Sequence, residues 1–400
     1  MNRLFPTLGP IVSSAPAVIL SLPRRVRLTV IFTATTILVG LNLLDSAQFL
    51  ITQPKYSDYF LYYLAAHLGL TKGWGAMYDP RIYLPALWHA TGRVPMPYLN
   101  PPPLAWLAVP LTLMPYLIGL AIWSAAIFGT FLLAWWLLAP GTALDRFAHL
   151  LAVLGLSLVV IMLHLGQVVS LVMAAVALCW WLIRKERPLM AGMVLAVMLL
   201  KPQTALLVPL TLLIAGYRRV FIGWALVAIP LTAGSLFAMG PEGIRNFQSG
   251  SAVVYDGWAP VVSSINGLVP DPLAMALQVA ALGLTLATAW RARQRGPELP
   301  IAAGVVGSTL VVPYLHVYDL ATLALCAWLA LRVGLSGWQQ LLLLASYVLL
   351  AFASEGNWSF SLLIVRFAWL VGLFMLSSGS GVRERQLLPA PAIRPQRAAA

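Results

Sequence analysis

The sequence predicts an all-α polytopic membrane protein, and three observations support this fold class. Of the 400 residues, 60% are hydrophobic and only 9% are charged, and the mean hydropathy is +0.87. Soluble proteins carry about 25% charged residues, so this chain has too few charges to cover a water-exposed surface. The apolar residues also fall into long runs separated by short polar breaks, which is typical of membrane-spanning helices. We therefore expect one integral membrane domain over residues 1–400.

Twelve segments are predicted to span the membrane, because a span needs roughly 20 mostly apolar residues. They lie at about 28–51, 117–139, 147–163, 168–183, 188–200, 203–215, 220–239, 272–290, 299–314, 319–331, 338–353 and 358–377. Pro101–Pro115 is too short and too rich in proline for a full span, so we expect a half-helix or an in-plane element there. Residues 11–22 are also too short, and we interpret them as an interfacial or flexible lead-in.

The basic residues predict the orientation of these spans. The chain has 25 Lys and Arg against 12 Asp and Glu, a net charge of +13. If the twelve spans alternate, 18 of the 25 basic residues fall on one side, which the positive-inside rule identifies as cytoplasmic. Both termini are then cytoplasmic, with a flexible tail at 378–400, and the long loops 52–116 and 240–271 are periplasmic. The basic excess thus reports topology, and we expect no nucleic-acid partner.

The sequence lacks the motifs of several classes of function. Cys179 and Cys326 both lie in apolar runs and indicate neither a disulfide framework nor a cysteine-based metal site. There is no Walker A motif, no Gly-rich dinucleotide fingerprint and no H-E-x-x-H motif. We therefore expect no nucleotide-driven transport, no metal and no other cofactor.

Asp58 is the first candidate for chemistry, because ionisable residues near membrane spans are costly and often functional. It follows the first span within the segment YSDYFLYY. A carboxylate in this partly apolar setting is suited to accepting a proton. The alternative is a structural role, in which Asp58 caps the amino end of the helix that follows.

Lys201 is the second candidate, because it interrupts two apolar runs of 13 residues in the sequence LKPQ. Proline at the first position of a helix is favoured, and the free N–H groups there attract anions. This pattern predicts a phosphate site. The alternative is a lysine that extends its ammonium group toward the membrane surface.

His316 and Asp319 share a third break and are three residues apart, hence on one face of a helix. Such a pair can be a proton relay, an oriented base or a structural hydrogen bond. Gln167, beside His164 at another break, is interpreted as a buried amide with its hydrogen bonds satisfied.

Two further charged residues have structural alternatives. Asp79 precedes Pro80 near glycines, which is typical of a turn. Arg366 lies inside the last span and must pair with Glu355, Asp45 or a lipid phosphate. The aromatic residues of loop 52–116 are expected to be interface anchors or stacking surfaces for a sugar; they are Trp74, Tyr78, Tyr83, Trp88 and Tyr98.

Taken in order along the chain, several landmarks resemble a known family. They are Ser57 to Phe60 with Tyr62-Tyr63, Gly73 to Asp79, Pro101 to Leu111, Gly166-Gln167, Leu200 to Gln203, Ser264 to Gly267 and Pro313 to Asp319. From the first span to about Leu331, the chain resembles the membrane-embedded GT-C type glycosyltransferases. The resemblance is to glycosyltransferase family 87 in particular, the phosphatidylinositol mannoside and related mannosyltransferases.

This resemblance implies a GT-C type bundle of about 12 transmembrane helices, with periplasmic loops that carry short helices. It implies an inverting hexosyltransferase of the bacterial plasma (inner) membrane that acts on the extracytoplasmic face without a metal. The donor would be a polyprenyl-phosphate sugar, most commonly of mannose, and the acceptor a lipid or glycan of the cell envelope. Asp58 matches the family's catalytic base.

Roles for the other candidates follow from the same resemblance. Lys201 is the first choice for the donor phosphate, assisted by Gln203 and Arg366, while His316 binds the phosphate or orients the acceptor and Asp319 orients His316. We expect substrate contacts from Tyr59, Tyr62, Tyr78, Asp79, Gln167, Trp258 and Asn266.

Two other functions stay open. A transporter or flippase of lipid-linked sugars would use the same intramembrane polar residues without making a glycosidic bond. Such carriers usually repeat their broken helices in both halves, and this chain shows no convincing repeat. A non-catalytic membrane partner in cell-envelope assembly is the third possibility.

Overall fold

The computed structural model describes residues 23–92, 96–258, 264–353 and 359–378, and all regular structure within these ranges is helical. The α-helices are α2 (Arg24–Thr52), α3 (Asp58–Lys72), α4 (Pro80–Thr91), α5 (Pro102–Ala108), α6 (Tyr116–Leu138), α7 (Ala143–Leu154), α8 (Ser157–His164), α9 (Val169–Arg184), α10 (Pro188–Leu195), α11 (Val208–Ile214), α12 (Arg218–Trp258), α13 (Asp271–Arg291), α14 (Glu298–Val311), α15 (Leu323–Val333), α16 (Gly337–Ala351) and α17 (Ser359–Ser378). Short 3-10 segments join them: η1 (Pro54–Tyr56), η2 (Ala76–Tyr78), η3 (Val109–Leu113), η4 (Ala196–Leu200), η5 (Pro202–Thr204) and η6 (Val317–Thr322).

Several helices are long and apolar enough to cross a membrane, which indicates a multi-pass membrane protein. Five qualify within the described residues: parts of α2 and α12, together with α6, α13 and α17. The bent pair α7 and α8 makes a sixth if it is counted as one span. The other six predicted spans coincide with shorter helices, from the 7 residues of α11 to the 16 of α9.

The segment predicted as one span over 147–163 is broken, and that prediction of a continuous helix is wrong. Helices α7 and α8 meet at an angle of 76° around Gly155. A break frees backbone carbonyls that must find new partners in an apolar setting. The side-chain amide of Asn42 in α2 supplies one, donating to the Gly155 carbonyl at 3.2 Å. The bend therefore depends on a polar residue more than 100 positions away.

Helix α14 lies at the centre of the bundle and contacts α11, α13, α15 and α17. Every residue from Glu298 to Leu310 is buried, as expected for a helix that is apolar on all sides. Small residues allow its neighbours to come close, as in other membrane bundles. A Cβ atom on Gly304, for example, would lie 2.8 Å from the Cα of Val208 in α11.

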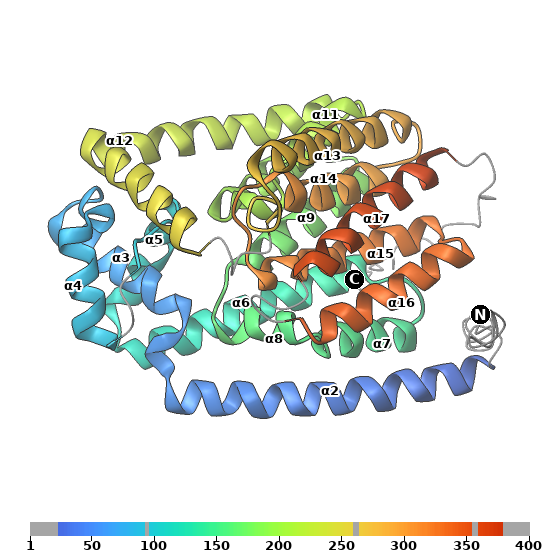
Figure 1. Cartoon of the computed structure of the whole chain (residues 1–400), viewed down its shortest axis with the longest axis horizontal. Coiled ribbons are helices and arrows are strands. Elements are labelled where there is room, and N and C mark those ends of the chain that lie inside the picture. Colours follow the sequence, from blue (N-terminus) through green and yellow to red (C-terminus); the bar gives the residue numbers. More distant parts are fainter. Residues whose placement is uncertain (1–22, 93–95, 259–263, 354–358, 379–400) are drawn as a thin grey trace, which may run out of the picture.

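The predicted periplasmic loop 52–116 is a compact helical body with its own hydrophobic core. Helices α3, α4 and α5 gather beyond the carboxyl end of α2 (Figure 1). Three loop aromatics that we expected to be membrane anchors or sugar-stacking surfaces are buried in this core. Tyr78 and Tyr83 each pack against Tyr98, with ring centroids 5.6 and 5.7 Å away.

Helix α12 connects the bundle to this body, and it continues through much of the predicted loop 240–271. Its first part runs along the upper edge of the molecule in Figure 1, and its second part turns back. The turn occurs at Gly240, whose φ of +64° favours glycine, directly before Pro241. Beyond the turn, Gly243 packs against Gly75 of the helical body.

The contact between α10 and α12 gives a test of close helix packing at glycine residues. A Cβ atom on Gly192 of α10 would overlap the carbonyl oxygen of Val220 in α12. We expect Gly192→Ala to destabilise the protein by about 1–3 kcal/mol, because two backbones must separate. Gly129→Ala in α6 is the matched control, since a Cβ atom there would have no atom of another described segment within 4 Å. Thermal unfolding in detergent measures both, and equal stability of the two variants would contradict the assigned packing.

Candidate active site

Three of the helix breaks predicted from the sequence meet in the structure. They are the turn between α8 and α9 with Gln167, the junction of η4 and η5 with Lys201, and η6 with Asp319. The Nζ atom of Lys201 lies 2.7 Å from Gln167 Oε1 and 2.7 Å from Asp319 Oδ1. One ammonium group therefore connects segments that are far apart in the chain.

Asp58 reaches this meeting point from the first turn of α3. Its backbone N–H donates to the Leu165 carbonyl at 2.8 Å, and its carboxylate accepts a hydrogen bond from Gln167 Nε2. Ser57, not Asp58, occupies the N-cap position of α3, so the structural alternative of a capping aspartate is wrong. Asp58 is half-buried, and its carboxylate is directed at the polar breaks of the bundle. We call Asp58, Gln167, Lys201, His316 and Asp319 the Asp58 cluster.

The amide of Gln167 is held by contacts at both ends. Its Oε1 accepts hydrogen bonds from Lys201 and from the Tyr62 hydroxyl at 3.3 Å. Burial, together with the negative charges of Asp58 and Asp319, raises the pKa of Tyr62, so its hydroxyl stays protonated and donates. Because two donors fix the carbonyl end, the NH₂ end must point to Asp58. Gln167 thus sets the direction of the carboxylate.

Lys201 and Asp319 form a buried ion pair. Lys201 is 5% exposed and Asp319 is fully buried, so the interpretation of Lys201 as a lysine extending to the membrane surface is wrong. The ammonium group also lies 4.6 Å from the centroid of the Tyr318 ring, a favourable position for a desolvated cation. This pair provides the electrostatic centre of the Asp58 cluster.

His316 is oriented by its neighbours in the same break. Its backbone N–H donates to Asp319 Oδ2 at 3.1 Å, within a reciprocal capping pair at the start of η6. The ring Nε2 is 2.6 Å from the Tyr314 hydroxyl, and the ring stacks on Tyr318 with centroids 4.9 Å apart. Asp319 therefore holds the backbone of His316, while two tyrosines hold the ring.

Tyr59 and Gln203 are close in sequence to Asp58 and Lys201, respectively. The Tyr59 ring is buried against Trp123 and Tyr116, with both centroids 5.5 Å away, and its hydroxyl is buried without a hydrogen-bond partner among the described residues. Gln203 is half-buried in η5, two residues after Lys201.

Tyr78 and Asp79 belong instead to the helical body around α4. Asp79 caps α4 by accepting from the Arg81 N–H at 2.9 Å, and the Arg81 side chain makes two further bonds to the carboxylate. These bonds hold the pKa of Asp79 below its usual range. The Tyr78 hydroxyl donates to the Asn100 carbonyl at 2.7 Å. The geometry of Asp79 agrees with the turn interpretation.

Arg366 and Asn266 have their own partners elsewhere. Arg366 is fully buried in α17 and donates to the Thr309 carbonyl of α14 at 2.7 Å, which ties these two helices together. The side chain of Asn266 accepts from Gln278 in α13 at 2.5 Å. The side chain of Trp258 lies outside the described residues, as does Glu355, one partner considered for Arg366.

The sequence reasoning missed three contributors to the site. Tyr314 and Tyr318 hold the His316 ring, and Trp123 donates to the Gly166 carbonyl at 2.8 Å beside Gln167. The two tyrosines flank His316 within one short break, which was a usable signal. Trp123 lies inside an apolar span and gave none. Among the described residues, no three His, Cys, Asp or Glu side chains form a group that could hold a metal.

The buried ion pair predicts a non-additive effect on stability. Lys201→Met leaves the Asp319 carboxylate buried without its cation, and we expect a loss of about 3–5 kcal/mol. Lys201→Met combined with Asp319→Asn removes both charges and keeps an acceptor for the backbone N–H of His316. We therefore expect the double variant to recover at least about 1 kcal/mol of the lost stability. Thermal unfolding of the purified variants measures this. A double variant less stable than Lys201→Met would show that the pair is not the stabilising unit.

Comparison with known proteins agrees with the resemblance seen in the sequence. The sequence model of glycosyltransferase family 87 matches residues 98–315, more than half of the chain. No curated protein and no solved structure matches the chain. The matched region contains Gln167 and Lys201, whereas Asp58 precedes it and His316 follows it directly. The chain belongs to glycosyltransferase family 87 and is a sugar-transferring enzyme.

Proposed function

We propose that this glycosyltransferase moves a hexose, with mannose the first candidate, from a polyprenyl-phosphate donor to a lipid or glycan acceptor of the cell envelope. The reaction inverts the anomeric centre and needs no metal, with Asp58 as the base. One observation carries this proposal: Asp58, half-buried, is held by an amide that is itself held by the buried cation of Lys201.

The proposed reaction is a single displacement. The acceptor hydroxyl oxygen attacks the anomeric carbon and loses its proton to the Asp58 carboxylate. The bond between that carbon and the phosphate oxygen breaks, and polyprenyl phosphate leaves with the electron pair. One attack from the side opposite the leaving group inverts the configuration. Gln167 supports the step because it fixes the direction in which Asp58 accepts the proton.

The leaving phosphate needs positive charge and hydrogen-bond donors, and the Asp58 cluster offers the ammonium group of Lys201 and the ring of His316. We propose that the donor phosphate lies near Lys201 and His316, with Gln203 close by in η5. The contacts of Lys201 with Gln167 and Asp319 hold the ammonium group in place before the donor arrives. Arg366 is left out of this proposal, because its guanidinium is hydrogen-bonded between α14 and α17.

Removal of the proposed base gives the direct test. Asp58→Asn keeps the size of the side chain but lowers its basicity, so we expect sugar transfer to fall about 10²–10⁴-fold. Glu242→Gln is the control, an equally conservative change of an exposed carboxylate that contacts Arg81. The assay follows transfer from polyprenyl-phosphate mannose in proteoliposomes, with extracted envelope lipids as acceptor.

Two outcomes would overturn the proposal. Full activity of Asp58→Asn, with Glu242→Gln also active, would remove Asp58 as the base. Movement of the lipid-linked sugar across the bilayer, with no new glycosidic bond by mass spectrometry, would favour the flippase alternative.

We further propose that about twelve segments lie across the membrane, with both termini cytoplasmic and the Asp58 cluster extracytoplasmic. Basic residues far apart in the sequence support this orientation by gathering at one end of the bundle. Arg332 donates to the Leu138 carbonyl at the end of α6, and Arg295 donates to the Leu376 carbonyl near the end of α17. Arg184 lies 3.9 Å from Glu298 at the start of α14. We call this the basic end.

Cysteine labelling tests the orientation. Lys72→Cys at the end of α3 and Arg219→Cys at the start of α12 both place a thiol on an exposed residue. The native Cys179 and Cys326 are buried and should give little background. In intact cells, a membrane-impermeant maleimide should modify Lys72→Cys and should reach Arg219→Cys only after the cells are opened. The opposite pattern would invert the proposed topology.

A further inference from the structure

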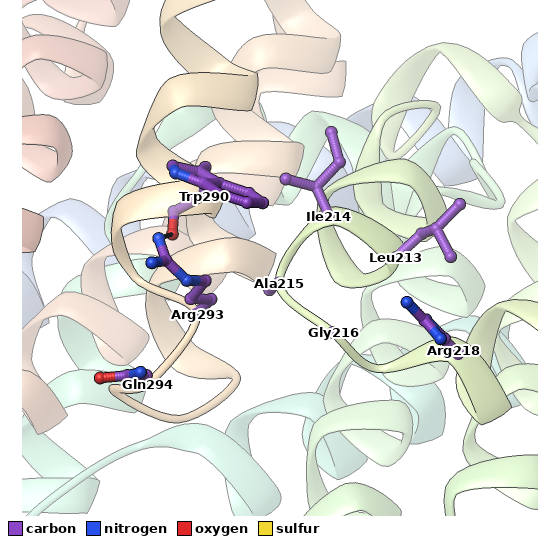
Figure 2. A pocket seen from close by; sticks show the side chains of 8 residues that line it. All are labelled: Leu213, Ile214, Ala215, Gly216, Arg218, Trp290, Arg293 and Gln294. Atoms are coloured by element: carbon purple, nitrogen blue, oxygen red, sulfur yellow. Dashed lines mark hydrogen bonds between the residues drawn. The ribbon is translucent and has the colours of Figure 1, made fainter.

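A surface cavity of about 540 Å³ opens at the basic end, away from the Asp58 cluster. Its lining comes from the turn between α11 and α12 and from the carboxyl end of α13, and includes Leu213, Ile214, Arg218, Trp290, Arg293 and Gln294. Figure 2 shows Trp290 and Arg293 on one wall and Leu213, Ile214 and Arg218 on the other. Arg218 at the start of α12 and Arg293 in the turn after α13 thus flank one opening, and no carboxylate is among its lining residues in the described part of the chain.

The two arginines are positioned differently. Arg293 donates to the Trp290 carbonyl at 2.9 Å, and its guanidinium lies 4.3 Å from the centroid of the Trp290 ring. Arg218 is exposed at the first residue of α12. One guanidinium is therefore held against an aromatic ring, while the opposite one remains exposed on the other wall. This arrangement offers an anion such as phosphate a guanidinium group on each wall.

The same face of α12 continues as an apolar groove. A second cavity, of about 330 Å³, is lined by Phe221, Ile222, Ala225, Leu226, Ile229 and Pro230. Counted from Arg218, positions 221, 222, 225 and 229 follow at the helical spacing of three, four, seven and eleven residues, so they share its face. Ile222, Leu226 and Ile229 are exposed. A cation is thus followed by an apolar groove along one helix, which is the pattern of a phospholipid headgroup and its acyl chain.

We propose that this face binds an anionic phospholipid, with its phosphate between Arg218 and Arg293 and one acyl chain along α12. Arg218 and Gly240 are about 33 Å apart along the helix, at 1.5 Å per residue, which is the thickness of a bilayer core. Gly240 adjoins the helical body that carries Asp58. The lipid therefore belongs to the leaflet opposite the Asp58 cluster, and the site lies apart from the groups proposed for sugar transfer.

Neighbouring arginines provide a matched test. Arg218→Gln and Arg219→Gln remove the same charge from adjacent exposed positions, but only Arg218 lines the cavity. Binding of phosphatidylglycerol to the detergent-purified protein is measured by native mass spectrometry, with phosphatidylcholine as the neutral comparison. We expect Arg218→Gln and Arg293→Gln each to weaken phosphatidylglycerol binding about fivefold, and Arg219→Gln to leave it within about twofold. Ala225→Trp, which fills the groove, should also weaken it.

Several results would overturn the proposal. Equal losses in Arg218→Gln and Arg219→Gln would show general attraction to a basic surface. Equal binding of phosphatidylcholine would remove the role of the arginines, and unchanged binding in Ala225→Trp would remove the acyl groove. Displacement of the lipid by millimolar inorganic phosphate would indicate a site for free anions. Thermal unfolding of each variant confirms that it is folded.

Discussion

The buried ammonium group of Lys201 is the constraint on which the Asp58 cluster depends. A buried charge is tolerated only when opposite charge and hydrogen bonds surround it. Lys201 obtains these from Asp319 in η6 and from Gln167 between α8 and α9. Three interrupted helices must therefore meet at one place, and the polar groups freed by each interruption become partners of the others. The breaks that shorten these helices are the same features that build the Asp58 cluster.

Asp58 itself comes from a separate folded body. Helices α3, α4 and α5 have their own hydrophobic core, and α3 starts where η1 ends, just beyond α2. The backbone bond from Asp58 to Leu165 joins this body to the bundle at the site itself. The direction of the carboxylate then depends on Gln167, which belongs to the bundle. Any relative movement of the two parts would alter the geometry of the proposed base.

Charged residues are distributed unevenly between the two ends of the molecule. Acidic and amide groups gather with Lys201 around Asp58, whereas Arg184, Arg295 and Arg332 gather at the opposite end of the bundle. The cations of the basic end are satisfied largely by carbonyl oxygens at helix ends, which favour positive charge. These bonds tie neighbouring helix ends together. The Asp58 cluster and the basic end thus lie at different ends of the bundle.

The sequence by itself determined that this is a membrane protein, the order of its apolar segments and the positions of the polar breaks between them. These features depend on the hydropathy of neighbouring residues, which is a local property. It also pointed to Asp58, Lys201 and Asp319 as residues that do not belong in lipid. Only the tertiary structure decided which of these groups touch. Arg366 bonds a backbone carbonyl of α14, and the α7–α8 bend depends on an amide of α2. Such partners come from distant parts of the chain. Which buried polar groups form hydrogen bonds with one another is therefore decided by long-range packing and not by the local sequence pattern.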